Sequence, residues 1–279
     1  MSKITGFLKT YSRALTNAAL ILSVGPLRNQ GRRQIEHIAQ LNMFASPPQT
    51  GENGSAPIRP PGLIPKIAVK ELINLPGEID VVRPEAINGN VSLLELIIIC
   101  KIAKQMNPRV AFEIGTFDGR TTVNIAANTA PESRTYTLDL PRTDIANTTF
   151  ALEKHDKLYI DKEASGVAFA ESELKSKITQ LYGDSAKFDF SLYDNKAQLI
   201  FIDGSHAYEY VLNDSHNALQ MLGDNQGAIL WHDYDTEAWF GVTQALNELY
   251  QNDKRYRGMR HVEETALAIL WNGNNLTNV

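Results

Sequence analysis

The chain has 279 residues, of which 43% are hydrophobic and 21% are charged, an ordinary composition for a globular protein that can bury a sizeable core. Its net charge of −5 argues against a general nucleic-acid binder, because such binding requires a basic face. The single cysteine, Cys100, excludes a disulfide framework and favours a reducing compartment.

The first 45 residues carry apolar side chains at helical spacing, and Gly25-Pro26 divides them into two predicted helices. The apolar stretch from Ala14 to Val24 is shorter than the roughly 20 residues that span a bilayer, and it precedes no small-residue cleavage signature. We therefore expect a cytoplasmic protein without stable membrane insertion. Basic residues between the apolar positions also suit a membrane surface. Docking onto the same chain, or onto a second subunit in a homo-oligomer, is the favoured interpretation.

Residues 46–87 begin with a run rich in proline and glycine, from Ser46 to Pro65, which is typical of a linker or surface strap. The remaining residues, 88–279, have the pattern of one α/β domain. A helix is expected from Ser92 to Lys104, because Ser92 and Glu95 have the spacing of a capping box.

Apolar runs that predict strands then alternate with helical segments. The predicted strands are residues 110–114, 135–140, 178–182, 197–202, 228–231 and 266–271, and the last helix runs from Trp239 to Tyr250. This alternation predicts a doubly wound, mostly parallel sheet of the Rossmann-like kind, with the N-terminal helices as an extension. Because ligands bind outside the carboxyl ends of the strands in such sheets, the residues that follow each strand are the informative ones.

The first strand of this domain runs into a turn that contains Gly115 and Gly119, and Thr121 opens the following helix. Such a turn directs free backbone N–H groups at a ligand, and its glycines allow the ligand to approach the main chain. The turn lacks the third glycine of the dinucleotide fingerprint. Glu113, just before the turn, would repel a diphosphate and suits a ligand with positive charge.

Acidic residues also follow the next two strands. Asp139 lies about 20 residues after Gly119, where α/β nucleotide folds bind ribose hydroxyls. Asp184 and Ser185 follow the third strand, and their side chains could meet an adenine amino group. The alternative for Gly183-Asp184-Ser185 is an ordinary turn.

The fourth strand runs into Asp203 and His206, and the fifth runs into His232 and Asp233. We expect these four side chains to converge on one pocket. Asp203 and Asp233 are ligands of the kind that magnesium, manganese or calcium prefers, and His232 could complete the site or favour a transition metal. The ordinary pKa of His206 lies near neutrality, so this residue is the natural general base. A helix cap at Asp203 and a structural hydrogen bond at His232 are the alternatives.

Taken in order, these motifs resemble those of class I S-adenosylmethionine-dependent methyltransferases. More narrowly, they resemble the group that includes catechol-type and macrolide-sugar O-methyltransferases, over about residues 88 to 272. The resemblance implies that Glu113 faces the methionine ammonium group and that Asp139 holds the ribose hydroxyls. The complete set of cofactor-binding residues that it implies is Glu113, Gly115, Thr116, Phe117, Gly119, Thr121, Asp139, Leu140, Asp184, Ser185 and Asp203.

The resemblance also implies a divalent metal, with Mg²⁺ as the expected ion, held by Asp203 and the pair His232 and Asp233. Relatives carry a carboxylate where this chain has His232. The position of His206 corresponds to the catalytic base. The expected reaction is O-methylation of a hydroxylated small molecule or a sugar.

Two other functions compete with methyl transfer. A nicotinamide-dependent oxidoreductase would require a third turn glycine and a hydride-transfer set such as Tyr-x-x-x-Lys, and we find no convincing set of this kind. A non-catalytic module that retains the cofactor pocket would bind the cofactor without turnover, and the presence of Asp203, His206 and Asp233 speaks against it.

Overall fold

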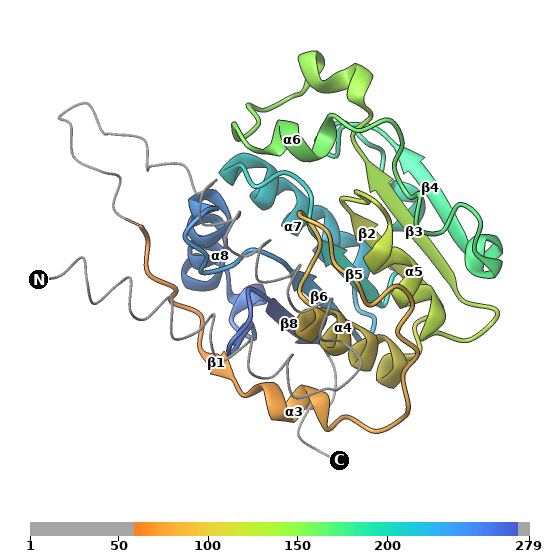
Figure 1. Cartoon of the computed structure of the whole chain (residues 1–279). Helices are drawn as coiled ribbons and strands as arrows, with labels where there is room; N and C mark the ends of the chain where they lie inside the picture. The colour runs from red at the N-terminus through yellow and green to blue at the C-terminus, as the bar shows by residue number, and fades with distance from the viewer. Residues whose placement is uncertain (1–58, 273–279) are drawn as a thin grey trace, which may run out of the picture. The chain divides into compact units, whose positions relative to one another are not determined.

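The structure is a computed structural model that describes residues 59–272, in which eight strands form one sheet (Figure 1). The strand order is β1-β7-β8-β6-β5-β2-β3-β4. The strands are β1 (Lys66–Ile67), β2 (Val110–Ile114), β3 (Arg134–Asp139), β4 (Ile178–Tyr182), β5 (Leu199–Ile202), β6 (Gly227–Trp231), β7 (Arg260–Val262) and β8 (Ala268–Asn272). The prediction of helices in residues 1–45 and the first part of the predicted linker lie outside the described residues.

The central strands β4, β3, β2, β5 and β6 pair in parallel, and β8 pairs antiparallel with both β6 and β7. The predicted doubly wound, mostly parallel α/β sheet is therefore confirmed. The chain continues from β2 to β3 on one side and returns to β5 on the other. The carboxyl ends of β2 and β5 thus form the point where the strand order reverses, and such points bind ligands in this fold class.

The helices of this unit are α3 (Val69–Ile73), α4 (Leu93–Met106), α5 (Arg120–Ala127), α6 (Asp156–Ile160), α7 (Tyr208–Leu222) and α8 (Phe240–Asn252). Short 3₁₀ helices span Arg142–Asn147, Glu173–Lys177, Ser191–Tyr193 and Lys254–Tyr256. The predicted capping box at the start of α4 is confirmed. The Glu95 N–H donates to Ser92 Oγ at 3.3 Å, and the Ser92 N–H donates to Glu95 Oε2 at 2.7 Å.

Alternation along the strands divides the core into two layers. Phe112, Ile200 and Ile229 face the cluster that includes residues of α7 and α8. Ala111 and Leu199, one residue before Phe112 and Ile200, face the opposite cluster, which includes residues of α3, α4 and α5. Because side chains of a strand alternate between faces, both faces of the sheet are covered by helices.

Two strands have no counterpart in the sequence prediction. β1 has two residues and β7 has three, too few to produce an alternating pattern that could be recognised. β1 pairs with β7. Residues 66–73, inside the range predicted as a linker or strap, thus supply a strand and helix α3 to the same compact unit as residues 89–272.

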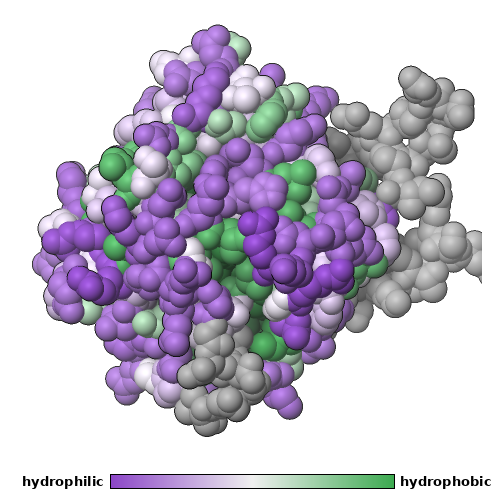
Figure 2. All heavy atoms as spheres, turned by 180° about the vertical axis from the view of Figure 1, so that it is seen from behind, coloured by the Kyte–Doolittle hydropathy of each residue, from purple (hydrophilic) through white to green (hydrophobic). Residues whose placement is uncertain are grey.

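Hydrophilic side chains cover most of the face drawn in Figure 2, with hydrophobic side chains visible between them. Leu158 and Leu192 are among the large hydrophobic side chains that are exposed. Within residues 59–272, no helix combines the length and apolar character that crossing a bilayer requires.

Candidate active site

The tips of β2 and β5 touch through Gly115, whose φ of +98° lies in the left-handed region. A Cβ atom at this position would lie 2.0 Å from the backbone oxygen of Asp203. The Asp203 N–H donates to the oxygen of Ile114 at 2.8 Å, and the Gly115 N–H donates to the oxygen of Leu138 at 2.8 Å. Only glycine fits this crossing, which brings the predicted cofactor turn against the strand that carries Asp203 and His206.

Glu113 is buried at the end of β2, next to this turn. Its carboxyl group accepts hydrogen bonds from Thr122 and, at 2.5 Å, from Thr137. The Thr137 hydroxyl also bonds that of Thr116 at 2.7 Å. Burial raises the pKa of Glu113 to about 8, although the two threonine hydrogen bonds oppose the change. Glu113 therefore carries a proton at neutral pH in the free protein.

The segment between β3 and β4 lies on the rest of the turn. The Gly166 N–H donates to the oxygen of Phe117 at 3.0 Å, and the Ala168 N–H donates to the oxygen of Asp118 at 2.8 Å. A Cβ atom on Gly119 would lie 2.5 Å from the ring of Phe169. Because Gly119 also has a φ of +84°, the turn and the segment can pack this closely only with glycine at this position.

The same segment contacts the acids that follow β3 and β4. Asp139 Oδ2 accepts from Lys162 Nζ at 2.8 Å and from Ser165 Oγ at 2.5 Å. Asp184 accepts from the backbone N–H and the hydroxyl of Thr149 at 2.7 and 2.8 Å, and from the Tyr210 hydroxyl at 2.8 Å. Burial alone would raise the pKa of Asp184, but its hydrogen bonds outweigh burial, and the pKa is lower than its ordinary value.

The other residues of the predicted cofactor set lie in the turn, in the first turn of α5 and after β3 and β4. Thr116 is buried in the turn and Thr121 is buried in α5, whereas Leu140 follows β3, Ser185 follows β4 and both are partly exposed. No role could be predicted for Lys162, Ser165 or Thr149, because they lie in a segment without apolar periodicity or a motif.

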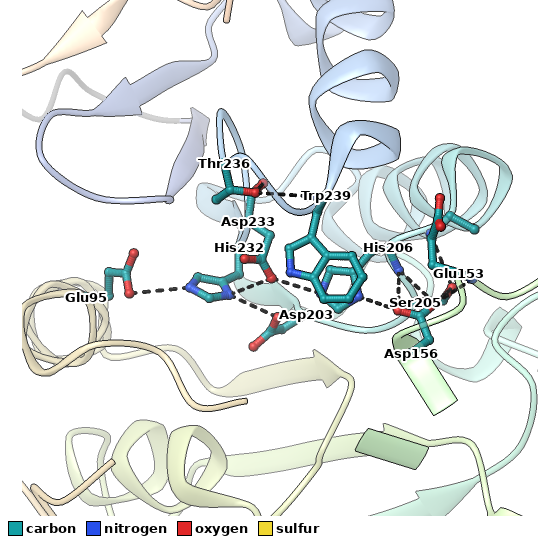
Figure 3. A network of polar contacts seen from close by, with 11 residues as sticks. Glu95, Glu153, Asp156, Asp203, Ser205, His206, His232, Asp233, Thr236 and Trp239 are labelled. Carbon is teal, nitrogen blue, oxygen red and sulfur yellow. Dashed lines mark hydrogen bonds and ion pairs between the residues drawn. The ribbon is translucent and has the colours of Figure 1, made fainter. Parts of the chain in front are cut away.

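The four side chains expected after β5 and β6 lie together in one polar network (Figure 3). His206 Nε2 lies 2.9 Å from Asp233 Oδ2, and His206 Nδ1 lies 2.6 Å from Asp156 Oδ1. The Trp239 ring stacks on the His206 ring at a centroid distance of 3.8 Å. Burial lowers the pKa of His206, but the hydrogen bonds and charges of Asp156 and Asp233 outweigh it and raise that pKa to about 10. In this arrangement the imidazole is therefore a cation at neutral pH.

His232 occupies the other half of the network. Its Nδ1 lies 3.2 Å from Asp203 Oδ1 and 3.1 Å from Asp233 Oδ2, and its Nε2 lies 3.4 Å from Glu95 Oε2. Glu95 is buried and also accepts from the backbone N–H of Ala266 at 2.7 Å. Burial opposes the change, but the neighbouring carboxylates raise the pKa of His232 well above its ordinary value.

One atom each from Asp203, His232 and Asp233 lie within 4.8 Å of one another, a spacing that suits a metal ion. The donors are two carboxylate oxygens and one imidazole nitrogen, which fit a divalent cation. Glu95 holds the far nitrogen of His232, as carboxylates commonly do for metal-binding histidines. Asp233 has a φ of +62°, and this left-handed backbone at the end of β6 directs its carboxylate between the two histidines.

Part of the chain matches a known protein family. Residues 112–234 match the family model described as "Methyltransferase domain". The matched range begins in β2 and ends just after Asp233, so it contains the turn from Gly115 to Gly119 and also Asp203, His206, His232 and Asp233. Over this range the chain is similar to methyltransferase domains. A search of curated proteins gives no match.

Solved structures with a similar fold include three that contain a bound cofactor, SAM or SAH. Cofactor-bound Rv0187 from MTB is 14% identical with a TM-score of 0.48, over 74% of this chain and 87% of that chain. TomG, the O-methyltransferase of Streptomyces achromogenes involved in tomaymycin synthesis, is 14% identical with a TM-score of 0.46, over 66% and 82% of the two chains. The Bacillus cereus O-methyltransferase in complex with SAH is 16% identical with a TM-score of 0.45, over 75% and 93%.

Proposed function

We propose that this protein transfers the methyl group of S-adenosylmethionine to a hydroxyl oxygen of a small molecule or a sugar. The observation that carries the proposal is the contact between Gly115 and Asp203, which brings the cofactor turn to the network that contains His206. A methyl acceptor seated against that network lies beside the cofactor. The sulfonium is already activated, so alignment of the acceptor oxygen with the methyl carbon can lower the barrier by roughly 7–11 kcal/mol.

His206 is the group proposed to remove the hydroxyl proton. A base must be neutral before it can accept a proton, and the bond between Nε2 and Asp233 opposes this state. Asp233 Oδ2 lies nearly as close to Nδ1 of His232, at 3.1 Å, so the carboxylate can keep an ion pair with His232 when it leaves Nε2 of His206. We propose that the acceptor hydroxyl takes the place of Asp233 at Nε2 of His206. General-base catalysis of this kind contributes about 10²–10⁴-fold to the rate.

A divalent ion at the same network is part of the proposal. Asp203, His232 and Asp233 would hold it, and it would orient acceptor oxygens and lower the pKa of the oxygen that attacks. Asp139 Oδ2 is shared by Lys162 and Ser165, which leaves Oδ1 of Asp139 to accept from the ribose hydroxyls.

The test of this function is transfer of labelled methyl from S-adenosylmethionine to a panel of hydroxylated small molecules and sugars. We expect a labelled ether product, with transfer reduced by chelation and restored by Mg²⁺ or Mn²⁺. Binding of the cofactor with no transfer to any acceptor would instead favour a non-catalytic module. Labelled product that is unaffected by chelation would remove the ion from the proposal and leave methyl transfer in place.

Cofactor binding is expected to release protons near neutral pH. Glu113, with its pKa raised to about 8, is mostly protonated in the free protein at pH 7. The positive methionine group favours the carboxylate form, so its arrival lowers this pKa and expels the proton. Titration calorimetry in two buffers of different ionisation enthalpy measures the release, which should approach one proton at pH 7 and fall away above about pH 9. Glu113→Gln keeps a similar shape and should abolish the release. Equal release from this variant and the wild type would contradict the assignment of Glu113.

A further inference from the structure

The segment between β3 and β4 contributes a buried carboxylate to the polar network. Asp156, the first residue of α6, is 2% exposed. It accepts from His206 Nδ1 at 2.6 Å, from the Ser205 hydroxyl at 2.6 Å and more distantly from the His206 backbone N–H at 3.3 Å. All of these donors belong to the loop that follows β5. Asp156 therefore ties a segment that has no recognisable motif to the residue proposed as the base.

The contact fixes which nitrogen of His206 can exchange a proton. In the free protein both ring nitrogens face carboxylates, Nδ1 that of Asp156 and Nε2 that of Asp233. A carboxylate only accepts hydrogen bonds, so when the acceptor hydroxyl replaces Asp233 at Nε2, the hydrogen that remains on the neutral imidazole is the one on Nδ1. The stacked Trp239 ring, at an interplanar angle of 14°, restricts rotation of the imidazole. Figure 3 shows Asp156 and Asp233 on opposite edges of the His206 ring, so Nε2 points toward Asp233, one of the three proposed metal ligands.

We infer that Asp156 is a positioning residue for methyl transfer: it holds His206 in the tautomer and orientation that present Nε2 to the methyl acceptor. This inference rests on the proposed role of His206. Through Asp156, the segment between β3 and β4 would take part in the chemistry of methyl transfer. The same division of labour is known from catalytic triads, in which a buried aspartate orients the histidine without itself exchanging the proton.

Asp156→Asn tests the inference with little change in volume. The amide of the variant can donate to Nδ1 of His206, which leaves the imidazole hydrogen on Nε2 and blocks that nitrogen as a base. We expect kcat to fall by about 10²–10⁴-fold, with the Kd of S-adenosylmethionine nearly unchanged. In a His206→Ala background the same substitution should cause little further loss, because residues that act as a unit are not additive.

A matched control is Asp161→Asn, which removes a carboxylate just after α6 that pairs with Arg142 at 2.6 Å on the surface. This variant should keep the kcat of the wild type. ¹⁵N NMR of His206 provides a readout that is independent of turnover: in the free wild type both ring nitrogens should carry a hydrogen, and in Asp156→Asn Nδ1 should lose its hydrogen while Nε2 keeps it.

The outcomes separate this inference from the proposed function. Wild-type kcat in Asp156→Asn, together with loss of turnover in His206→Ala, would overturn the inference and leave His206 as the base. An unchanged ¹⁵N pattern in Asp156→Asn would overturn it whatever the kinetics. Full turnover in His206→Ala would reject His206 as the base and with it the role of Asp156 in methyl transfer, whatever the ¹⁵N pattern.

Discussion

His206→Ala should lower kcat by about 10²–10⁴-fold, equivalent to roughly 2.7–5.4 kcal/mol of transition-state stabilisation. The expectation follows from the position of His206 just after β5, with Nε2 directed toward Asp233. The Kd of S-adenosylmethionine should remain nearly unchanged, because no contact joins His206 to the predicted cofactor residues that follow β2 and β3 within the described chain. Single-turnover kinetics and equilibrium binding of the cofactor measure the two quantities separately.

Removal of His206 also leaves Asp156 and Asp233 without a shared partner in a buried site, so loss of stability must be distinguished from loss of chemistry. His206→Asn serves as the control, because its amide can still donate to Asp156 but cannot take up a proton at neutral pH. The Asn variant should be more stable to heat than the Ala variant and equally slow. Parallel loss of kcat and cofactor affinity in both variants would mean that His206 has a structural role only.

The residues at the strand ends could be predicted from the sequence because their placement depends on two local patterns. An apolar run followed by a polar residue marks the end of a strand, and parallel pairing brings successive ends to one edge. Asp203, His206, His232 and Asp233 meet in the structure for this reason. The helix start at Ser92 was predictable because a capping box involves residues only three positions apart.

Asp156 and Glu95 could not be assigned to the site from the sequence. Asp156 reaches His206 from 50 positions away, and Glu95 reaches His232 from 137 positions away. Glu95 also has a local explanation, since the same oxygen, Oε2, accepts from the Ser92 N–H and completes the cap of α4. The charge state of His206 could not be predicted from the sequence either, because it depends on two carboxylates, Asp156 and Asp233, that come together only in the folded chain.

Gly115→Ala should weaken cofactor binding more than any other single-methyl change at the turn. The added Cβ would lie 2.0 Å from the backbone oxygen of Asp203, and no side-chain rotation can relieve a contact with backbone. The φ of +98° adds strain for any residue other than glycine. Overpacking and strain each cost about 1–3 kcal/mol, and relief requires the tips of β2 and β5 to separate.

The separation of these tips should affect both parts of the proposed reaction, since the turn and Asp203 would move apart. A cost of about 2–3 kcal/mol corresponds to roughly a 30- to 200-fold loss of cofactor affinity if it falls on the binding-competent arrangement. Gly258→Ala is the matched control, because its Cβ would meet only the Leu270 Cδ1 atom, at 3.1 Å, in a side chain that can move. Calorimetric titration with S-adenosylmethionine and thermal denaturation of both variants measure the effect. Wild-type affinity in Gly115→Ala would show that the cofactor does not depend on the approach of β2 to β5, and the proposed adjacency of methyl donor and His206 would lose its structural basis.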